Sequence, residues 1–363
     1  MYLWESDSLP TGVWQTLAET ERPILVYGMG NGADKLAERL ALLGKTVDAY
    51  FASDGFVRGQ TFRAQTVLSR SEALSRFADP IVLLAFASNR PEVLSMLYAV
   101  DGECDLYMPD LPVSGEEYFD VPFYLRHRTE IRRLADLLAD EESRRTLDAV
   151  LRYKLTGRIG YLRKTGEGKA DLSGILHPDG YRRALDGGAY SGDTASALLD
   201  VAPNLLEIVA VEPDRRNYKR LCRYAEGETR ARVTPMHAAL LDGVGEALFS
   251  VSGNRNATLG AGSYGAKQES VPTVSVDSVG AGFDFIKLDV EGAERDALLG
   301  AVKTVAECRP ELLVSVYHRS EDLFALPHLL SELCPDYRFY LRRDECLPAW
   351  ERNLLAVPCE HCI

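Results

Sequence analysis

Two places in the chain combine a short apolar run, a glycine-rich turn and a helix pattern, and this combination limits the fold more than any other feature. The first run, Ile24 to Tyr27, leads into the turn Gly28 to Gly32 and then into a helix pattern. The second run ends at Leu185 and leads into Gly187 and Gly188. Apolar runs that alternate with amphipathic helices are typical of parallel α/β sheets. We therefore expect an α/β protein with two Rossmann-like units.

The same alternation predicts where the units begin and end. In the first half we expect helices from Ala33 to Leu43 and near Pro91, and strands at residues 47–51 and 81–86. In the second half we expect strands near residues 183–185, 208–211, 233–238, 285–288 and 312–316. The charged, leucine-spaced segments 129–138 and 143–155 between them indicate connecting helices. This predicts a nucleotide-binding-like domain over 1–108, a helical linker over 109–178 and a larger α/β domain over 179–363.

Composition narrows the class of partner. The hydrophobic fraction of 46% is typical of globular proteins. The net charge is -13, so the overall electrostatic field of the protein repels nucleic acid. The apolar runs are too short to cross a bilayer, and the acidic start of the chain is unlike a secretory signal. We expect a cytoplasmic protein that acts on a small molecule, without nucleic acid or membrane, and that can form a homo-oligomer.

The seven cysteines are scattered, which indicates reduced thiols rather than a disulfide framework. The tail from Cys359 to Cys362 has metal-ligand residue types, with His361 inside it. A tetrahedral site needs partners that so short a terminus cannot supply alone. We therefore expect a frayed tail and predict no metal.

The turn after Leu185 is the strongest local signal for a ligand. Glycines let the backbone approach a ligand closely, and the first turn of the following helix offers N–H groups. A plain strand-to-helix turn is the alternative. The residues predicted to contact a cofactor here are Asp186, Gly187, Gly188, Ala189, Gly192, Asp193 and Thr194.

The next strand ends in Glu212 and Pro213, some twenty residues further on. An acidic side chain at this spacing can accept both hydroxyls of a ribose, so we predict Glu212 as the ribose anchor with Pro213 beside it. Ala239 follows another strand and is predicted to border an adenine. Asp242 could serve there too or be an ordinary turn residue.

A cluster of carboxylates follows the strand that ends at Leu288, namely Asp289, Glu291 and Glu294. Like charges so close together are costly without a function or a partner. Lys287 is available as a partner, so a purely structural ion cluster is the alternative. The last expected strand ends beside Tyr317 and His318, with Glu321 and Asp322 behind them.

These motifs resemble the FkbM family of methyltransferases, above all in the run from Ile286 to Glu294, and also in the turn from Asp186 to Thr194 and in Val211 to Asp214. The resemblance covers about residue 181 to the C-terminus. It implies a class I methyltransferase fold with seven strands, S-adenosylmethionine as methyl donor, and a hydroxyl acceptor on a sugar, a nucleotide-linked sugar or a natural product.

Methyl transfer from a sulfonium needs alignment of the reactants and removal of one proton. We predict His318 as the base, because an imidazole titrates near neutral pH, and Asp289 as the alternative base and a cofactor contact. Glu291 and Glu294 are predicted to bind the acceptor hydroxyl, although they could also steady loops or hold a divalent cation. The polar segment Ser252 to Gly265 is either an acceptor lid or an ordinary hairpin.

The N-terminal turn allows several interpretations. Its third glycine falls one position early for a dinucleotide fingerprint, but Asp54 lies at about the ribose distance, so an NAD(P)-dependent oxidoreductase is the main rival. This region also resembles the Rossmann-like N-terminal domains of sugar acyltransferases. On that basis Gly28, Gly30 and Asn31 are predicted to bind a nucleotide or carrier part of the acceptor. A docking or dimerising module and an N-methyltransferase are further alternatives.

Overall fold

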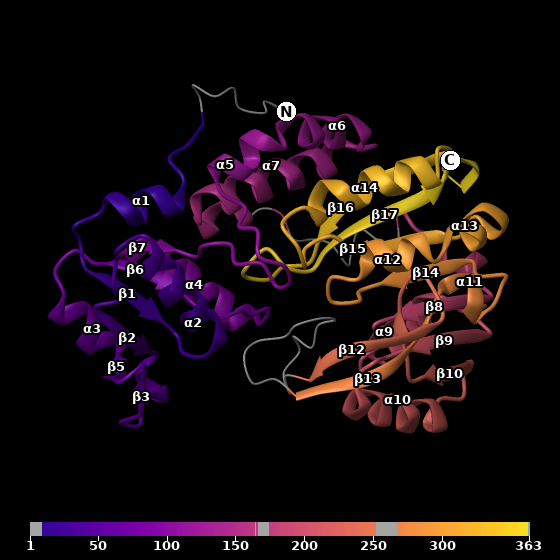
Figure 1. Cartoon of the computed structure of the whole chain (residues 1–363), viewed down its shortest axis with the longest axis horizontal. Coiled ribbons are helices and arrows are strands. Elements are labelled where there is room, and N and C mark those ends of the chain that lie inside the picture. Colours follow the sequence, from indigo (N-terminus) through magenta and orange to yellow (C-terminus); the bar gives the residue numbers. More distant parts are fainter. Residues whose placement is uncertain (1–8, 164, 166–173, 252–266, 362–363) are drawn as a thin grey trace.

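The computed structural model describes residues 9–163, 165, 174–251 and 267–361. Figure 1 shows two α/β units, each built on its own main sheet, with the N-terminal unit in indigo to purple and the C-terminal unit in pink, orange and yellow. One cluster of buried apolar side chains includes Leu25 of the first sheet, Leu151 of a linking helix and Leu185 of the second sheet. Both sheets are therefore packed into a common core.

The N-terminal sheet has five parallel strands in the order β5-β2-β1-β6-β7. The strands β1, β2 and β6 are buried along their whole length, as expected for a parallel sheet covered on both faces. The elements of this unit are α1 (Val13–Glu19), β1 (Ile24–Tyr27), α2 (Asn31–Leu42), β2 (Ala49–Ala52), η2 (Asp54–Phe56), β3 (Thr61–Phe62), β4 (Gln65–Thr66), β5 (Leu68–Ser69), α3 (Arg70–Arg76), β6 (Ile81–Leu84), α4 (Pro91–Glu103) and β7 (Asp105–Tyr107).

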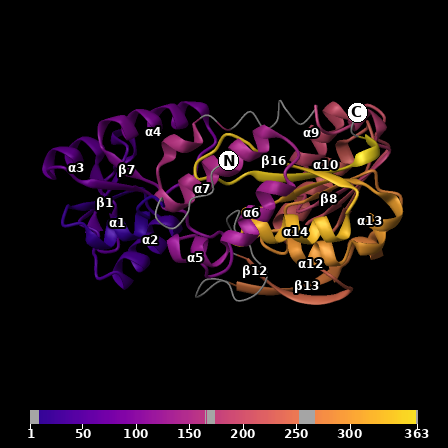
Figure 2. The ribbon, with the colours of Figure 1, turned by 90° about the horizontal axis from the view of Figure 1, so that it is seen from above.

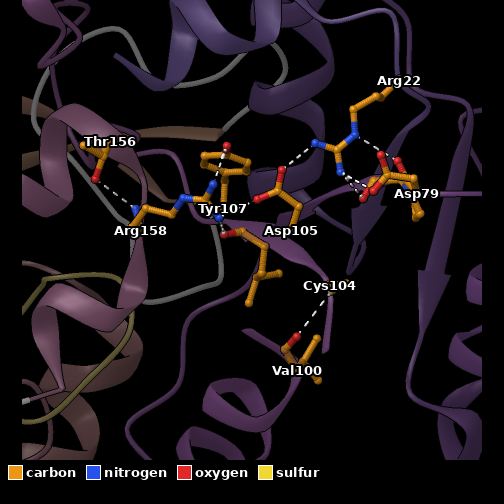
Figure 3. A network of polar contacts seen from close by, with 10 residues as sticks. Arg22, Asp79, Val100, Cys104, Asp105, Tyr107, Thr156 and Arg158 are labelled. Atoms are coloured by element: carbon orange, nitrogen blue, oxygen red, sulfur yellow. Dashed lines mark hydrogen bonds and ion pairs between the residues drawn. The ribbon is translucent and has the colours of Figure 1, made fainter. Parts of the chain in front are cut away.

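Two arginines form ion pairs at the amino ends of these strands (Figure 3). Arg22, which precedes β1, donates to Asp79 before β6 at 2.9 Å and to Asp105 of β7 at 2.6 Å. Arg158, which follows helix α7 (Glu141–Thr156), also pairs with Asp105 at 2.6 Å and lies over the ring of Tyr107. The pKa of Asp105 is lowered, because the two guanidinium groups outweigh the effect of burial.

The segment between the two sheets is mainly helical and covers the edge of the second sheet. Its elements are α5 (Val121–Arg126), α6 (Arg128–Leu137), α7 (Glu141–Thr156), η3 (Ile159–Leu162) and η4 (Pro178–Gly180). Ser143 of α7 accepts a hydrogen bond from the Leu341 amide, and Asp140 pairs with Arg342. Leu341 and Arg342 both belong to strand β16 (Tyr337–Arg343). The position of α6 and α7 agrees with the helices that the sequence indicated.

The second sheet has seven strands in the order β10-β9-β8-β14-β15-β17-β16; β17 runs antiparallel to β15 and β16, and the other neighbouring pairs are parallel. Its elements are β8 (Arg183–Gly187), α9 (Asp193–Val201), β9 (Glu207–Val211), α10 (Arg215–Gly227), β10 (Arg232–Met236), β14 (Phe285–Leu288), α12 (Glu294–Leu299), α13 (Val302–Cys308), β15 (Glu311–Ser315), α14 (Asp322–Leu333), β16, β17 (Arg352–Pro358) and η5 (Cys359–His361). A smaller sheet, with the order β11-β13-β12, consists of β11 (Ala239–Leu240), β12 (Gly245–Val251) and β13 (Lys267–Val274), and α11 (Val276–Val279) follows it.

The structure corrects two sequence-based expectations here. The strand that leads to Tyr317 is not the last, because β16 and β17 follow it and form an antiparallel pair. The C-terminal tail is not frayed up to residue 361, because η5 follows β17 directly and Glu360 pairs with Arg309 at 2.6 and 2.7 Å. Among the described residues, no helix combines the length and apolar character that a membrane span requires.

The carboxyl edges of the two sheets are bridged by the chain that follows β7. The Ser114 amide in this segment donates to the carbonyl of His318 at 2.8 Å, and Lys35 of α2 donates to Pro112 at 2.8 Å. Ser88, shortly after β6, exchanges two backbone hydrogen bonds with Leu347, in the loop between β16 and β17. Figure 2 shows the two units side by side, with the linking helix α5 between them.

Candidate active site

The candidate site lies where the strand order of the seven-stranded sheet reverses. From β8 the chain proceeds outward to β9 and β10, and it then returns to β14 on the other side of β8. The strands β8 and β14 are paired at this point, and open α/β sheets bind ligands outside the carboxyl ends of the strands where the order reverses. The predicted glycine turn and the predicted carboxylate cluster follow these two neighbouring strands.

The turn after β8 is packed against the end of β14. Gly188 has φ +76°, and a Cβ atom on it would lie 1.8 Å from the carbonyl oxygen of Asp289. The amides of Gly188 and Ala189 both donate to the carbonyl of Val211, at the end of β9. Only glycine allows this approach of two backbones, so the turn requires glycine at position 188.

Glu212 is fixed by backbone amides on both sides. Its Oε2 accepts from the Tyr190 amide and its Oε1 from the Asp214 amide, each at 2.8 Å. The side chain is buried, and burial raises its pKa to about 7, although the two amides work in the opposite direction. The carboxylate is therefore held in one orientation between the glycine turn and the start of α10, and its remaining lone pairs stay available to a ligand.

Lys287 joins the two turns. Its Nζ lies 3.3 Å from Asp186 Oδ1 and 3.7 Å from Asp289 Oδ2, and it donates to the carbonyl of Gly188 at 3.0 Å. Burial alone lowers the pKa of Lys287, but Asp186 and Asp289 outweigh it and raise the pKa. Asp186 is itself buried, which raises its pKa against the effect of Lys287. Asp186 thus helps to hold Lys287, which in turn contacts both the glycine turn and Asp289.

Three carboxylates surround the imidazole of His318. Its Nδ1 lies 2.9 Å from Glu294 Oε1, and its Nε2 lies 3.4 Å from Asp289 Oδ1 and 3.6 Å from Glu291 Oε2. Tyr317 donates to Asp289 Oδ1 at 3.3 Å. All three carboxylates that the sequence singled out therefore meet one ring, which comes from the next strand of the sheet.

These charges shift one another's pKa values. Burial lowers the pKa of His318, but Glu294, Asp289 and Glu291 outweigh it and raise the pKa to about 10. Burial raises the pKa of Glu291 to about 8, against the attraction of His318. The pKa of Asp289 is lowered, because Lys287 and His318 outweigh burial. At neutral pH the ring of His318 is thus a cation, and a protonated imidazole cannot accept a further proton.

Exposure divides the cluster into a front and a back. The side chains of Asp289 and Glu291 are 29% and 34% exposed, whereas those of His318 and Glu294 are 1% exposed each. Glu294 Oε1 also accepts from the Val290 amide, which holds it beneath the turn. Only the two front carboxylates can contact a ligand that arrives from solvent in this conformation.

The segment after β7 also contacts the candidate site, at His318 and Gly292. The sequence did not indicate this contribution. Ser114 reaches both the His318 carbonyl and Gly292, where a Cβ atom would meet Ser114 Oγ at 2.7 Å. Arg319 donates to the Gly292 carbonyl at 3.0 Å, and Ser320 donates to the Glu117 carbonyl at 2.7 Å. No local motif marks these residues, because the contacts join segments about 200 positions apart.

The remaining predicted residues lie as follows. Gly192 is the N-cap of α9, its Cβ position is filled by the ring of Tyr224, and Asp193 and Thr194 begin the helix. Ala239 is buried in β11 and Asp242 is exposed. His237 Nε2 lies 3.1 Å from the carbonyl of Pro213, and its ring stacks on Tyr218. The predicted lid, Ser252 to Gly265, lies outside the described residues.

The N-terminal turn has a different environment. Gly28 and Gly30 have positive φ, and Asn31 begins α2. A Cβ on Gly32 would lie 2.2 Å from the carbonyl oxygen of Ala85, so this third glycine packs the helix onto the end of β6. Asp54, the expected ribose ligand of an oxidoreductase, instead accepts from the amide and hydroxyl of Ser71. None of these residues lies in the cluster around His318.

A metal ion is one further possibility for the cluster around His318. The ligand atoms of Asp289, Glu294 and His318 lie within 4.8 Å of one another. Carboxylate oxygens suit hard cations such as Mg²⁺, but a metal ligand must be a neutral imidazole. The raised pKa of His318 opposes that role, because it favours the protonated ring.

The strand order of the second sheet and the glycine turn after β8 are those of a Rossmann-like methyltransferase fold, which here has an additional N-terminal α/β unit. Residues 186–344 match the sequence model of the methyltransferase FkbM domain. No curated protein matches the chain by sequence.

Comparison with solved structures shows one with the same fold over almost the whole chain. Methyltransferase FkbM from Methylobacillus flagellatus KT aligns with a TM-score of 0.71 at 22% identity, over 96% of this chain and 94% of that chain. Fibrillarin from Aeropyrum pernix, in complex with natively bound S-adenosyl-L-methionine, aligns with a TM-score of 0.34 at 17% identity, over 52% of this chain and 73% of that chain. The first similarity extends through both α/β units.

Proposed function

We propose that the protein transfers a methyl group from S-adenosylmethionine to a hydroxyl of a small-molecule acceptor, such as a sugar, a nucleotide-linked sugar or a natural product. The observation that supports this best is Glu212, a buried carboxylate oriented by two amides beside a glycine turn at the switch point of the sheet. The match of residues 186–344 to the methyltransferase FkbM domain supports methyl transfer as the reaction.

The residues around the glycine turn fit an adenosyl group. A carboxylate with unused lone pairs can accept from both ribose hydroxyls, which is the task that Glu212 would have. Pro213 and the stacked pair of Tyr218 and His237 lie next to it and would border the base. The surplus of carboxylates around Lys287 and His318 favours a positive charge nearby. When bound, S-adenosylmethionine supplies an activated methyl group on a sulfonium.

Asp289 and Glu291 are the groups that we assign to the acceptor. They are the exposed members of the cluster and face the same nitrogen of His318. An acceptor hydroxyl would donate to this pair, and the pair would take its proton as the oxygen–methyl bond forms and the methyl–sulfur bond breaks, which leaves S-adenosylhomocysteine. Because a base works best when its pKa lies near the working pH, the pKa of about 8 for Glu291 suits this role.

His318 is assigned to positioning rather than to proton removal. The sequence favoured it as the base because a typical imidazole titrates near neutral pH. In the folded protein its ring is buried and its pKa is raised to about 10, so a protonated ring would hold Asp289, Glu291 and Glu294 together. Glu294 anchors the ring from behind.

For the N-terminal unit we propose the recognition of a nucleotide or carrier part of the acceptor by the turn with Gly28, Gly30 and Asn31. The chain from Pro112 to Ser114 contacts both α2, which begins at that turn, and His318, which supports a link between the two edges. Calorimetry of the full chain with a nucleotide-linked sugar tests this. Equal affinity for wild type and Asn31→Ala would contradict the assignment.

The test of the main proposal is calorimetry with S-adenosylmethionine and S-adenosylhomocysteine on wild type, Glu212→Gln and Glu207→Gln. Glu207 lies on the same strand but at its amino end, where it pairs with Arg183 and Arg232, so it is a matched control. Hydrogen bonds to a charged group contribute about 1.5 to 3 kcal/mol, so we expect Glu212→Gln to weaken binding about 10- to 100-fold. Unchanged affinity in this variant would refute the ribose assignment.

A further inference from the structure

A second cluster of ligand-type side chains lies at the opposite, amino edge of the seven-stranded sheet. Glu311, the first residue of β15, is completely buried, and two histidines face one of its oxygens. His177 Nδ1 lies 2.7 Å and His361 Nδ1 lies 3.1 Å from Glu311 Oε1. The three residues come from three distant parts of the sequence, and the proposed methyl-transfer site contains none of them.

The carboxylate of Glu311 is held in place by its other oxygen. Glu311 Oε2 accepts from the His177 amide at 2.9 Å and from the hydroxyl of Tyr181. This leaves Oε1 directed at the two imidazoles. Partners of this kind orient metal-binding carboxylates and hold them ready for a cation.

The C-terminal tail is also held before any ligand arrives. Arg309 forms two hydrogen bonds with Glu360, and the Cys359 amide donates to Asp336 at 2.9 Å. These contacts place His361 beside His177, with the ring centroids 5.8 Å apart. The short tail thus gains the partners that its own sequence does not contain.

We propose that His177, Glu311 and His361 form a binding site for Zn²⁺. The donor atoms of all three lie within 4.8 Å of one another. Two ligands bound to Zn²⁺ at about 2.0 to 2.1 Å in a tetrahedron lie roughly 3.3 Å apart, so small movements of the two rings would suffice. Two histidines and one glutamate are an established ligand set for this ion.

The exposure of the site suits a cation that enters from solvent. Each histidine side chain is 44% exposed, whereas Glu311 is inaccessible. The ion would enter between the rings, and water would complete its coordination. Bound there, Zn²⁺ would fasten the C-terminal tail to β15 and to the segment before β8, far from the methyl-transfer crevice.

The experiment measures Zn²⁺ binding to the full, untagged chain by competition with a chromophoric chelator. We expect one equivalent to bind to wild type, and His361→Ala and His177→Ala to weaken the affinity at least about 100-fold, since even the loss of an outer partner typically costs about 10- to 100-fold. His328→Gln is the matched control, because His328 contacts the Glu130 carbonyl elsewhere. Asp289→Asn tests the other cluster, and we expect it to retain the ion.

Two features make the test decisive. Both substituted rings are exposed, so the variants should fold, and circular dichroism checks this. With Co²⁺ in place of Zn²⁺, wild type should show visible absorption of a tetrahedral site that His361→Ala lacks. No binding to wild type, unchanged affinity in His361→Ala, or loss of the ion in Asp289→Asn would each overturn the proposal.

Discussion

The two sheets begin alike and differ in what their switch points contain. Both place a glycine turn after their first strand in the sequence, β1 or β8, and a helix behind it. In the seven-stranded sheet, Glu212 and the residues around His318 surround that turn with charged side chains. In the five-stranded sheet, the turn faces Phe86 and Ala85, and the nearby acidic residue Asp54 is bound to Ser71.

This contrast shows that a strand, a glycine turn and a helix do not by themselves define a cofactor site. Glycine provides space for backbone approach in both turns, but the chemistry depends on the side chains that neighbouring strands deliver. The C-terminal turn receives them from β9, β14 and β15. Substitutions at matched positions of the two sheets test whether the two glycine turns differ in function.

The largest effect is expected from a pair of glycine substitutions. In Gly188→Ala the new Cβ would overlap the Asp289 carbonyl at 1.8 Å, which no side-chain movement can relieve. We expect a loss of at least about 4 kcal/mol of stability and no cofactor binding. In Gly30→Ala nothing lies within 4 Å, so only backbone strain of about 1 to 3 kcal/mol remains. Thermal unfolding and calorimetry measure both, and equal losses would contradict the contrast.

Asp289→Asn should have the next largest effect. The substitution keeps the shape of the side chain but removes a charge that faces both Lys287 and His318. A proton-accepting group typically contributes about 10²- to 10⁴-fold in rate, so we expect turnover to fall within that range. The measurement is single-turnover methyl transfer once an acceptor is known. Asp54→Asn serves as the control from the other sheet, and a variant of Asp289 with full turnover would exclude it from the reaction.

His318→Gln should change the pH profile as well as the rate. The imidazolium lowers the pKa of Glu291, so its removal should move the acidic limb of the pH–rate profile upward. We expect a shift of about one pH unit, since one unit corresponds to about 1.4 kcal/mol of lost interaction. The rate should fall without loss of cofactor affinity. His328→Gln should leave the profile unchanged, and an unshifted profile in His318→Gln would remove the positioning role.

A smaller effect concerns stability against pH. His318 has a folded pKa of about 10 against an ordinary value of 6.5, so the stability that it contributes is complete below about pH 6.5 and is lost as the pH rises through 10. Glu212, raised from 4.5 to about 7, acts in the same direction at lower pH. We expect the free energy of unfolding of the ligand-free chain to fall by on the order of 2 kcal/mol between pH 6 and 9, and the thermal midpoint to fall with it. A rising midpoint would contradict these shifts.

The sequence predicted the fold and the residues that local motifs mark. Strands β8, β9, β14 and β15 lie within one or two residues of their expected positions, because buried parallel strands are strongly apolar. Asp289, Glu291, Glu294 and His318 were each identified, and the structure brings them together. The protonation state of His318 could not be predicted, because it depends on distances between carboxylates from separate turns. Ser114, His177 and Glu311 were missed, because their contacts join distant segments.

The central claim is that an adenosyl group binds with its ribose at Glu212. The most direct measurement is a crystal structure of the full chain with S-adenosylhomocysteine. We expect both ribose hydroxyls within hydrogen-bond distance of the Glu212 carboxylate, at roughly 2.5 to 3.0 Å, with the sulfur directed toward Asp289. An occupied site in which the ribose contacts other residues, or binding at the N-terminal turn instead, would contradict the account.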